Sequence, residues 1–325
     1  MCQSGPVLTS IRSPAGSALT IVDTTYMSCN LIAMTHDNDP IANVSVLSTG
    51  SVRIRPEHVG PTRKNTYVWL ATSRRWTAPR PINVYVIEHR DGLVLFDTGQ
   101  DRASVTEPDY FPGGLNGVVY DRLARFEIGS DQTLARGLAA LGLRADDVHT
   151  AVISHLHQDH MGGLPELAGA EIVVSDAEWR SMRRPLAAAR GYLRDHIELP
   201  GLHWRQVVPE PLGDPSLAPF GAGHDLFGDG SLLLLPTPGH TPGSLSMLVR
   251  RPGRAPLLLV GDLTYDAGLL AAGEIPGVGN KSQLRRAVAS VNELRDRLPG
   301  LTVLAAHDPG AAALLAAATT GRVTA

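Results

Sequence analysis

The chain has 325 residues, of which 43% are hydrophobic and 19% are charged, a balance typical of a globular protein with a buried core. The formal net charge is −3, so the composition gives no support to the binding of nucleic acid or of an anionic membrane surface. Only two cysteines are present, which excludes a framework of several disulfides.

The sequence contains no pattern typical of a targeting or membrane segment. In the first 25 residues, serine, proline and glycine interrupt the apolar residues, unlike the continuous apolar core of a secretion signal. No stretch reaches the roughly 18 uncharged apolar residues that a membrane helix needs. These features predict a soluble, cytoplasmic protein. A homodimer is compatible with them.

The first half of the chain alternates between expected strands and one helix. Residues 1–43 have little periodicity and predict a poorly ordered extension before one folded domain over residues 44–325. A hairpin turn is expected at Arg90-Asp91-Gly92, and a helix over residues 130–143 with Ser130 as its N-cap. Strands are expected over residues 44–54, 82–89, 92–99 and 148–155.

The second half continues this pattern, which is typical of the α/β class. A helix is expected from Ser175, where Ser175 and Glu178 fit a capping box. Residues 183–230 are irregular and are interpreted as an insertion that covers a site, with one helix near residues 185–196. Strands are expected over residues 170–175, within 231–249, from 255 and from 301, and an amphipathic helix over residues 282–298.

A cluster of metal-binding residue types follows the strand at 148–155, in the stretch "SHLHQDHMGG". It holds His155, His157, Asp159 and His160 within six positions. Ordinary surface or core histidines are the alternative reading, but a chance match to so dense a pattern is rare. Imidazole and carboxylate without thiolate suit zinc or a similar divalent ion.

Further residues of these types stand where other apolar strands end. Taken singly, His240 could be a turn histidine, Asp262 a helix N-cap, and His307 a strand-end histidine that pairs with Asp308. Their shared position is informative, because strand ends hold functional loops rigidly. Asp97 also follows an apolar strand.

The order of these motifs resembles that of the metallo-β-lactamase superfamily, and of N-acyl-homoserine lactonases within it. The resemblance covers residues 44–308 and consists of His-x-His-x-Asp-His with Gly-Gly, then Gly-His-Thr-Pro-Gly, Gly-Asp and a final strand-end histidine. It implies an αββα sandwich of two mixed sheets flanked by helices. It also implies two divalent metal ions, with Zn²⁺ favoured, at one edge of the sheets.

The resemblance also assigns the ligands. It places His155, His157 and His240 on a first metal and Asp159, His160 and His307 on a second, with Asp262 as a bridge. In the superfamily, the aspartate that corresponds to Asp97 supports the ligand loops without binding metal.

The same resemblance implies a dinuclear metal-dependent hydrolase that opens the lactone ring of N-acyl-homoserine lactones by attack of a metal-bridging hydroxide, an activity known as quorum quenching. Tyr265, three residues after Asp262, would hydrogen-bond the substrate, and Asp159 would return a proton to the leaving oxygen. A loop tyrosine packed on its neighbours is the alternative reading of Tyr265. Hydrolysis of another ester, a thioester or an organophosphate, or a non-catalytic metal-binding module, are the alternative functions.

The acyl pocket is less well specified by the sequence. Gln158 departs from the aromatic residue often found inside the first motif of the family. Tyr67, Trp69 and Trp76 are candidate walls of an apolar groove for an acyl tail, and ordinary packing explains them equally well.

Overall fold

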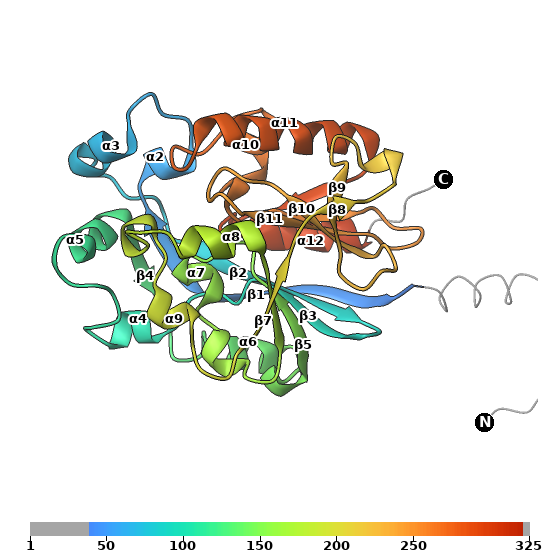
Figure 1. The fold of residues 1–325 in the computed structure, drawn as a ribbon, viewed down its shortest axis with the longest axis horizontal. Helices are drawn as coiled ribbons and strands as arrows, with labels where there is room; N and C mark the ends of the chain where they lie inside the picture. The colour runs from blue at the N-terminus through green and yellow to red at the C-terminus, as the bar shows by residue number, and fades with distance from the viewer. Residues whose placement is uncertain (1–38, 321–325) are drawn as a thin grey trace, which may run out of the picture. The chain divides into compact units, whose positions relative to one another are not determined.

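Two mixed β-sheets pack face to face in the computed structural model, which describes residues 39–320 (Figure 1). The first sheet has seven strands in the order β4-β1-β2-β3-β5-β6-β7. Pairs on the β4 side of β3 are antiparallel, and those from β3 to β7 are parallel. The strands are β1 (Ile41–Ile54), β2 (Arg80–His89), β3 (Gly92–Phe96), β4 (Ala124–Glu127), β5 (Val148–Val152), β6 (Glu171–Ser175) and β7 (His203–Val207).

The second sheet has six strands in the order β13-β12-β11-β10-β9-β8. All of its pairs are antiparallel except β12 with β13, which is parallel. The strands are β8 (Glu210–Pro211), β9 (Ala222–Asp225), β10 (Leu232–Pro236), β11 (Leu245–Val249), β12 (Leu257–Leu259) and β13 (Thr302–Leu304).

The alternation of side chains along β10 explains why the second sheet is buried on both faces. Leu232 and Leu234 point into the core between the sheets, where they join Phe96 of β3. Leu233 and Leu235 point the other way, into the core beneath α11. A run of four leucines therefore serves two apolar layers at once.

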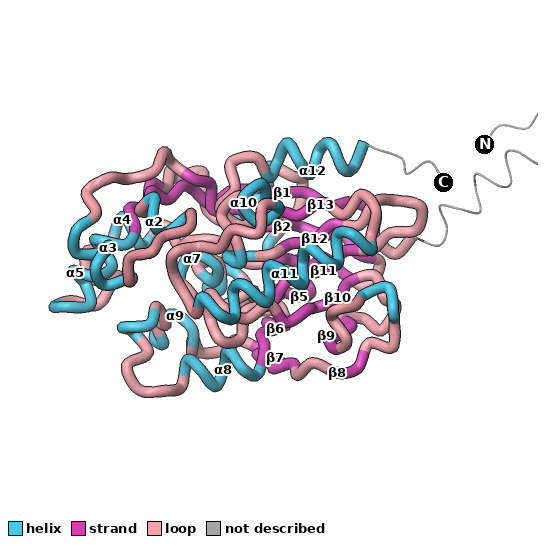
Figure 2. Tube along the Cα trace, turned by 90° about the horizontal axis from the view of Figure 1, so that it is seen from above, coloured by secondary structure: helices cyan, strands magenta, loops and turns pink. Residues whose placement is uncertain are grey.

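Helices cover both outer faces of this sandwich (Figure 1). The long helix α11 lies across the strands of the second sheet when the molecule is seen from above (Figure 2). The helices are α2 (Pro56–Val59), α3 (Thr66–Thr72), α4 (Ala103–Thr106), α5 (Gly114–Leu123), α6 (Leu134–Ala140), α7 (Gln158–Met161), α8 (Asp176–Met182), α9 (Arg194–Ile197), α10 (Ala267–Ala271), α11 (Lys281–Arg297) and α12 (Ala311–Thr320). This arrangement confirms the predicted αββα sandwich.

The amphipathic helix predicted over residues 282–298 is α11. Asn280 caps its N-terminus, because its side chain accepts hydrogen bonds from the backbone N–H groups of Ser282 and Gln283. The buried face consists of Leu284, Ala287, Val288, Val291 and Leu294. Along residues 39–320, no helix combines the length and apolarity required to cross a membrane.

At two elements, the start differs from the expected one for a specific structural reason. Strand β1 begins at Ile41 rather than after residue 43, because Ile41 is buried and pairs with His89 of β2. Residues 1–38 of the expected extension lie outside the described part of the chain. Helix α6 begins at Leu134 with Thr133 as its cap, rather than at Ser130, because the Gln132 side chain closes a turn onto the Gly129 N–H.

The segment expected to be an irregular insertion, residues 183–230, contributes strands to both sheets. β7 extends the first sheet beside β6, and β8 and β9 extend the second. β7 and β8 are edge strands and β9 has only four residues. All three have few apolar residues, so they lack the apolar pattern that predicts a strand. The single helix expected near residues 185–196 is divided into a 3₁₀ turn over Ala188–Arg190 and helix α9, with Gly191 at φ 90° between them.

Candidate metal centre

All seven candidate ligands lie together at one edge of the sandwich, where the C-terminal ends of five strands meet. In the first sheet, β5 leads into the loop that carries His155 and His157, and α7 carries Asp159 and His160. In the second sheet, the loops that follow β10, β12 and β13 carry His240, Asp262 and His307. Because β3 and β5 are parallel, the loop at Asp97 reaches the same edge.

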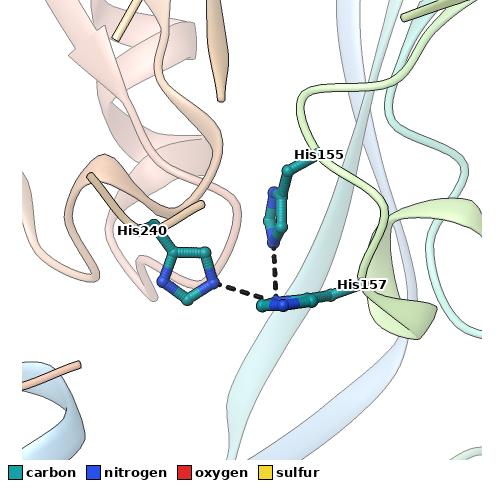
Figure 3. Close-up of side chains that lie close together, drawn as sticks. All are labelled: His155, His157 and His240. Atoms are coloured by element: carbon teal, nitrogen blue, oxygen red, sulfur yellow. Dashed lines mark hydrogen bonds between the residues drawn. The ribbon is translucent and has the colours of Figure 1, made fainter. Parts of the chain in front are cut away.

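The first group of ligands consists of three histidines whose rings converge on one point (Figure 3). Nδ1 of His157 lies 3.1 Å from Nε2 of His155 and 3.0 Å from Nε2 of His240. Ligand atoms about 2.05 Å from a tetrahedral zinc ion would be roughly 3.3 Å apart. The three nitrogen atoms are therefore spaced like the ligands of one ion.

For two of the histidines, a hydrogen bond to a backbone carbonyl shows which ring nitrogen faces away from the centre. Nε2 of His157 lies 3.2 Å from the carbonyl oxygen of Arg190, and Nδ1 of His307 lies 2.9 Å from that of Pro81. A carbonyl oxygen only accepts, so these nitrogens carry protons, and in the neutral form of each ring the inward nitrogen carries the lone pair. An inward lone pair is what a metal ion binds, so the orientation of both rings fits a metal centre.

The second group contains Asp159, His160 and His307 and shares Asp262 with the first. Oδ1 of Asp262 lies 3.4 Å from Nε2 of both His160 and His307, and Oδ2 of Asp159 lies 3.4 Å from Nε2 of His307. Nε2 of His160, Nε2 of His307 and Oδ1 of Asp262 are buried without a hydrogen-bond partner among the described residues. Buried polar atoms of this kind fit coordination to an ion.

The two carboxylate oxygens of Asp262 face different groups. Oδ1 faces His160 and His307, whereas Oδ2 lies 3.5 Å from Nε2 of His240. A carboxylate that presents one oxygen to each of two ligand sets can bridge two ions.

The electrostatics of the cluster favour a divalent cation. Burial lowers the pKa of His240 to about 3, and burial together with the neighbouring histidines lowers that of His155 well below its ordinary value. Burial acts to raise the pKa of Asp262, but His307 and His160 hold it well below its usual range. Neutral imidazole and ionised carboxylate are the forms that bind metal, so a metal ion would displace a proton from His160 and His307, whose pKa values Asp262 raises against the effect of burial.

Asp97 supports this centre from behind without facing it. Its Oδ1 accepts a hydrogen bond from the Ser154 N–H at 2.7 Å, and its Oδ2 accepts from Nδ1 of His160 at 2.8 Å. Its backbone is in the left-handed region at φ 62°, which is strained for a residue other than glycine and is typical of functional sites.

Glu178 joins the two halves of the centre, a role that its position in the sequence did not indicate. Ser175 caps α8 as predicted, but the Glu178 carboxylate does not complete a capping box. Instead, its Oε1 accepts from the Leu156 N–H at 3.1 Å and its Oε2 accepts from the Gly243 N–H at 3.0 Å. One buried carboxylate thus ties the loop of His155 and His157 to the loop of His240.

Tyr265 lies beside the shared aspartate and is almost fully buried, with 2% of its surface exposed. Its hydroxyl donates to Oδ2 of Asp262 at 2.6 Å and lies 3.0 Å from Nε2 of His58. Burial and the charge of Asp262 raise the pKa of the phenol well above its ordinary value, so it keeps its proton. Sequence reasoning missed His58, because no motif surrounds it.

A pocket of about 280 Å³ opens next to the cluster. Its lining includes Tyr265, Asp159 and Gln158, and helices α2 and α5 supply further lining residues from the end of the sandwich where α2, α3, α5 and α9 gather (Figure 1 and Figure 2). The apolar lining residues of this pocket include Val52, Ile54, Leu123, Ala124 and Val278.

The three aromatic residues considered as groove walls are not among the described lining residues of this pocket. Tyr67 is 81% exposed, and Trp69 is buried in the core beside Tyr265. The guanidinium group of Arg55 packs over the ring of Trp76, and its carbon atom lies 3.6 Å from the centroid of that ring. Ordinary packing, the alternative reading, accounts for Trp69 and Trp76.

A sandwich of two mixed sheets that gathers histidines and aspartates at one edge defines a metallohydrolase. The model of the metallo-beta-lactamase superfamily matches residues 77–307. The chain belongs to this superfamily and is a metal-dependent hydrolase, as the motif order indicates.

Relatives of similar sequence agree with this assignment, and solved structures share the fold. The chain is 33% identical over 234 residues to the N-acyl homoserine lactonase AttM of Rhizobium radiobacter, which covers 71% of this chain and 83% of that protein. It is 30% identical over 285 residues to the probable metallo-hydrolase Rv2300c of Mycobacterium tuberculosis, covering 81% and 86%. A structure of an N-acyl homoserine lactone hydrolase with N-hexanoyl-L-homoserine bound at its metal centre superposes with a TM-score of 0.65 at 19% identity, covering 83% and 94%.

Proposed function

We propose that this protein is a dinuclear metal-dependent lactonase that opens the ring of N-acyl-homoserine lactones. The observation that carries the proposal is the position of Asp262, whose two oxygens face two separate ligand sets next to a partly apolar pocket. The relationship to N-acyl homoserine lactonases supports the choice of substrate.

Two divalent ions fit the ligand sets, and zinc suits donors that are mainly imidazole nitrogen with carboxylate oxygen. His155, His157 and His240 would hold the first ion, Asp159, His160 and His307 the second, and Asp262 would contact both. When bound, the ions would supply Lewis acidity and lower the pKa of water enough for hydrolysis at neutral pH.

The protein's own groups position the substrate and move protons. The Tyr265 phenol keeps its proton at neutral pH and can donate a hydrogen bond to the lactone oxygen that gains negative charge. Asp159 lines the pocket beside it. Its carboxylate can take the proton that the attacking water loses and return that proton to the ring oxygen as that oxygen leaves. The apolar wall formed by Val52, Ile54 and Leu123 suits an acyl chain better than a charged group.

Turnover by zinc-loaded protein tests this proposal with a panel of N-acyl-homoserine lactones, thioesters, aryl esters and phosphotriesters. We expect the highest kcat/KM for the lactones and no turnover after the metal is removed by a chelator. Efficient hydrolysis of a thioester or phosphotriester with no opening of lactones would reject the lactonase and leave the metallohydrolase. No turnover of any substrate by fully loaded protein would favour a binding module.

A further inference from the structure

His58 is a partly buried histidine that lies outside the seven candidate ligands and lines the same pocket. It belongs to the short helix α2, and its ring lies between two aromatic residues. The ring centroids are 5.1 Å apart for His58 and Tyr265, in an edge-on arrangement, and 6.0 Å apart for His58 and Trp69. Nε2 of His58 is 3.0 Å from the hydroxyl of Tyr265.

The direction of this hydrogen bond follows from the other partner of Tyr265. The phenol has one proton, and it donates that proton to Oδ2 of Asp262 at 2.6 Å. His58 must therefore be the donor in its bond to the phenol oxygen, with its proton on Nε2. Nδ1 of His58 is buried without a hydrogen-bond partner within residues 39–320, and a bare lone pair is less costly there than an unsatisfied N–H group. Burial lowers the pKa of His58 to about 4, so the ring is neutral and has only this one N–H.

We propose that His58 is a positioning residue that aims the proton of Tyr265 into the reaction site. Its Nε2–H group donates to a lone pair of the phenol oxygen. The hydroxyl proton is therefore directed towards Asp262 or a substrate oxygen in the pocket. Donation to the phenol oxygen also polarises the O–H bond and strengthens it as a donor. The inference rests on the proposed role of Tyr265 in the lactonase.

The surrounding backbone is held independently of the His58 side chain. The backbone oxygen of His58 accepts from the Gly277 N–H at 3.2 Å, and its own N–H donates to the Arg55 oxygen at 2.9 Å. A Cβ on Gly277 would lie 1.9 Å from the Glu57 oxygen, so the two segments are in close backbone contact. Glu57 in turn accepts from the Ser73 hydroxyl at 2.8 Å. Substitution of the His58 side chain should therefore leave intact the backbone and Glu57 contacts that hold α2 in place.

The test compares two substitutions in the zinc-loaded protein. His58→Gln retains an N–H donor of similar reach, and His58→Leu retains bulk without a donor. We expect His58→Leu to lower kcat for N-acyl-homoserine lactones about as much as Tyr265→Phe, on the order of tenfold. We expect His58→Gln to restore most of the rate, with metal content unchanged in both variants. In the Tyr265→Phe background, His58→Leu should have no further effect on kcat.

Nitrogen-15 NMR of the histidine rings gives a readout that does not depend on turnover. The signals of His58 are identified by their loss in His58→Gln, and the proton should reside on Nε2 with a chemical shift that changes in Tyr265→Phe. Equal losses of kcat in the Gln and Leu variants, additive effects with Tyr265→Phe, or a proton on Nδ1 would overturn the proposal. If the protein opens no lactone, the proposed function fails. The role of His58 is still tested by the NMR result and by the double-mutant comparison of His58→Leu with Tyr265→Phe on the substrate that the protein does hydrolyse.

Discussion

The carboxylate of Asp97 lies 2.8 Å from Nδ1 of His160, on the opposite side of the ring from the candidate metal ligands. This contact fixes the ring so that Nε2 faces Asp262, 3.4 Å away. An outer carboxylate that holds a ligand histidine sets both the tautomer and the orientation of the ring.

Replacement of Asp97 by asparagine should weaken metal binding about 10- to 100-fold without unfolding the protein. Asparagine tolerates the left-handed backbone at φ 62°, so the turn is retained while the charge that holds the proton on Nδ1 is lost. Competition with a chelating dye measures the affinity, and circular dichroism checks the fold. An unchanged affinity would show that Asp97 acts on the backbone of the turn alone.

Purified protein loaded with zinc should contain close to two equivalents per chain, because the ligands form two sets that share Asp262. His157→Ala should lose the ion of the first set, and Asp262→Ala should weaken both. Elemental analysis after gel filtration measures the metal content. Full activity of a protein with one firmly bound equivalent would contradict the dinuclear centre.

The sequence predicted the strands that lead to the candidate ligands because each is a run of apolar residues that ends in a polar loop, as at β5 and β12. Residues whose contact partners lie far away in the sequence could not be predicted in this way. Glu178 contacts Gly243 across 65 positions, and His58 contacts Tyr265 across 207. Neither has a local pattern that distinguishes it from a helix cap or a surface histidine.

The pocket wall was also beyond prediction from the sequence. Its apolar lining includes residues of β1, of α5, of β4 and Val278, which approach one another only in the folded chain. Strands β7 to β9 were missed for a related reason, because these short strands at or next to the sheet edges have no apolar periodicity.

Replacement of Glu178 by glutamine should lower both the melting temperature and the metal content. The amide retains one acceptor, so the N–H group of Leu156 or of Gly243 loses its buried partner, at a cost of about 1–3 kcal/mol. Differential scanning calorimetry and elemental analysis measure the two effects. Glu166→Gln is the matched control, since Glu166 accepts from the Ala135 N–H at 2.9 Å and takes no part in the metal centre. The control variant should retain its metal, and its only effect should be a lower stability. Equal loss of metal in both variants would show a general loss of stability instead.

Replacement of Tyr265 by phenylalanine should lower kcat on N-acyl-homoserine lactones about tenfold and leave the metal content unchanged. The loss of an oxyanion donor can cost more, but two ions would also stabilise the same oxygen. Small activated aryl esters should be affected little, because their leaving groups need less stabilisation. Steady-state kinetics on both classes of substrate measure this difference.

The matched control for this substitution is Tyr85→Phe, which removes a buried hydroxyl that donates to the Ala305 oxygen at 2.8 Å, away from the pocket lining. It should lower stability by about 1 kcal/mol and leave kcat unchanged. If Tyr265→Phe has no more effect than this control while the wild-type protein opens lactones, the hydroxyl of Tyr265 contributes only to stability through Asp262. A loss of kcat with lactones alone, at full metal content, would place that hydroxyl on the reacting oxygen.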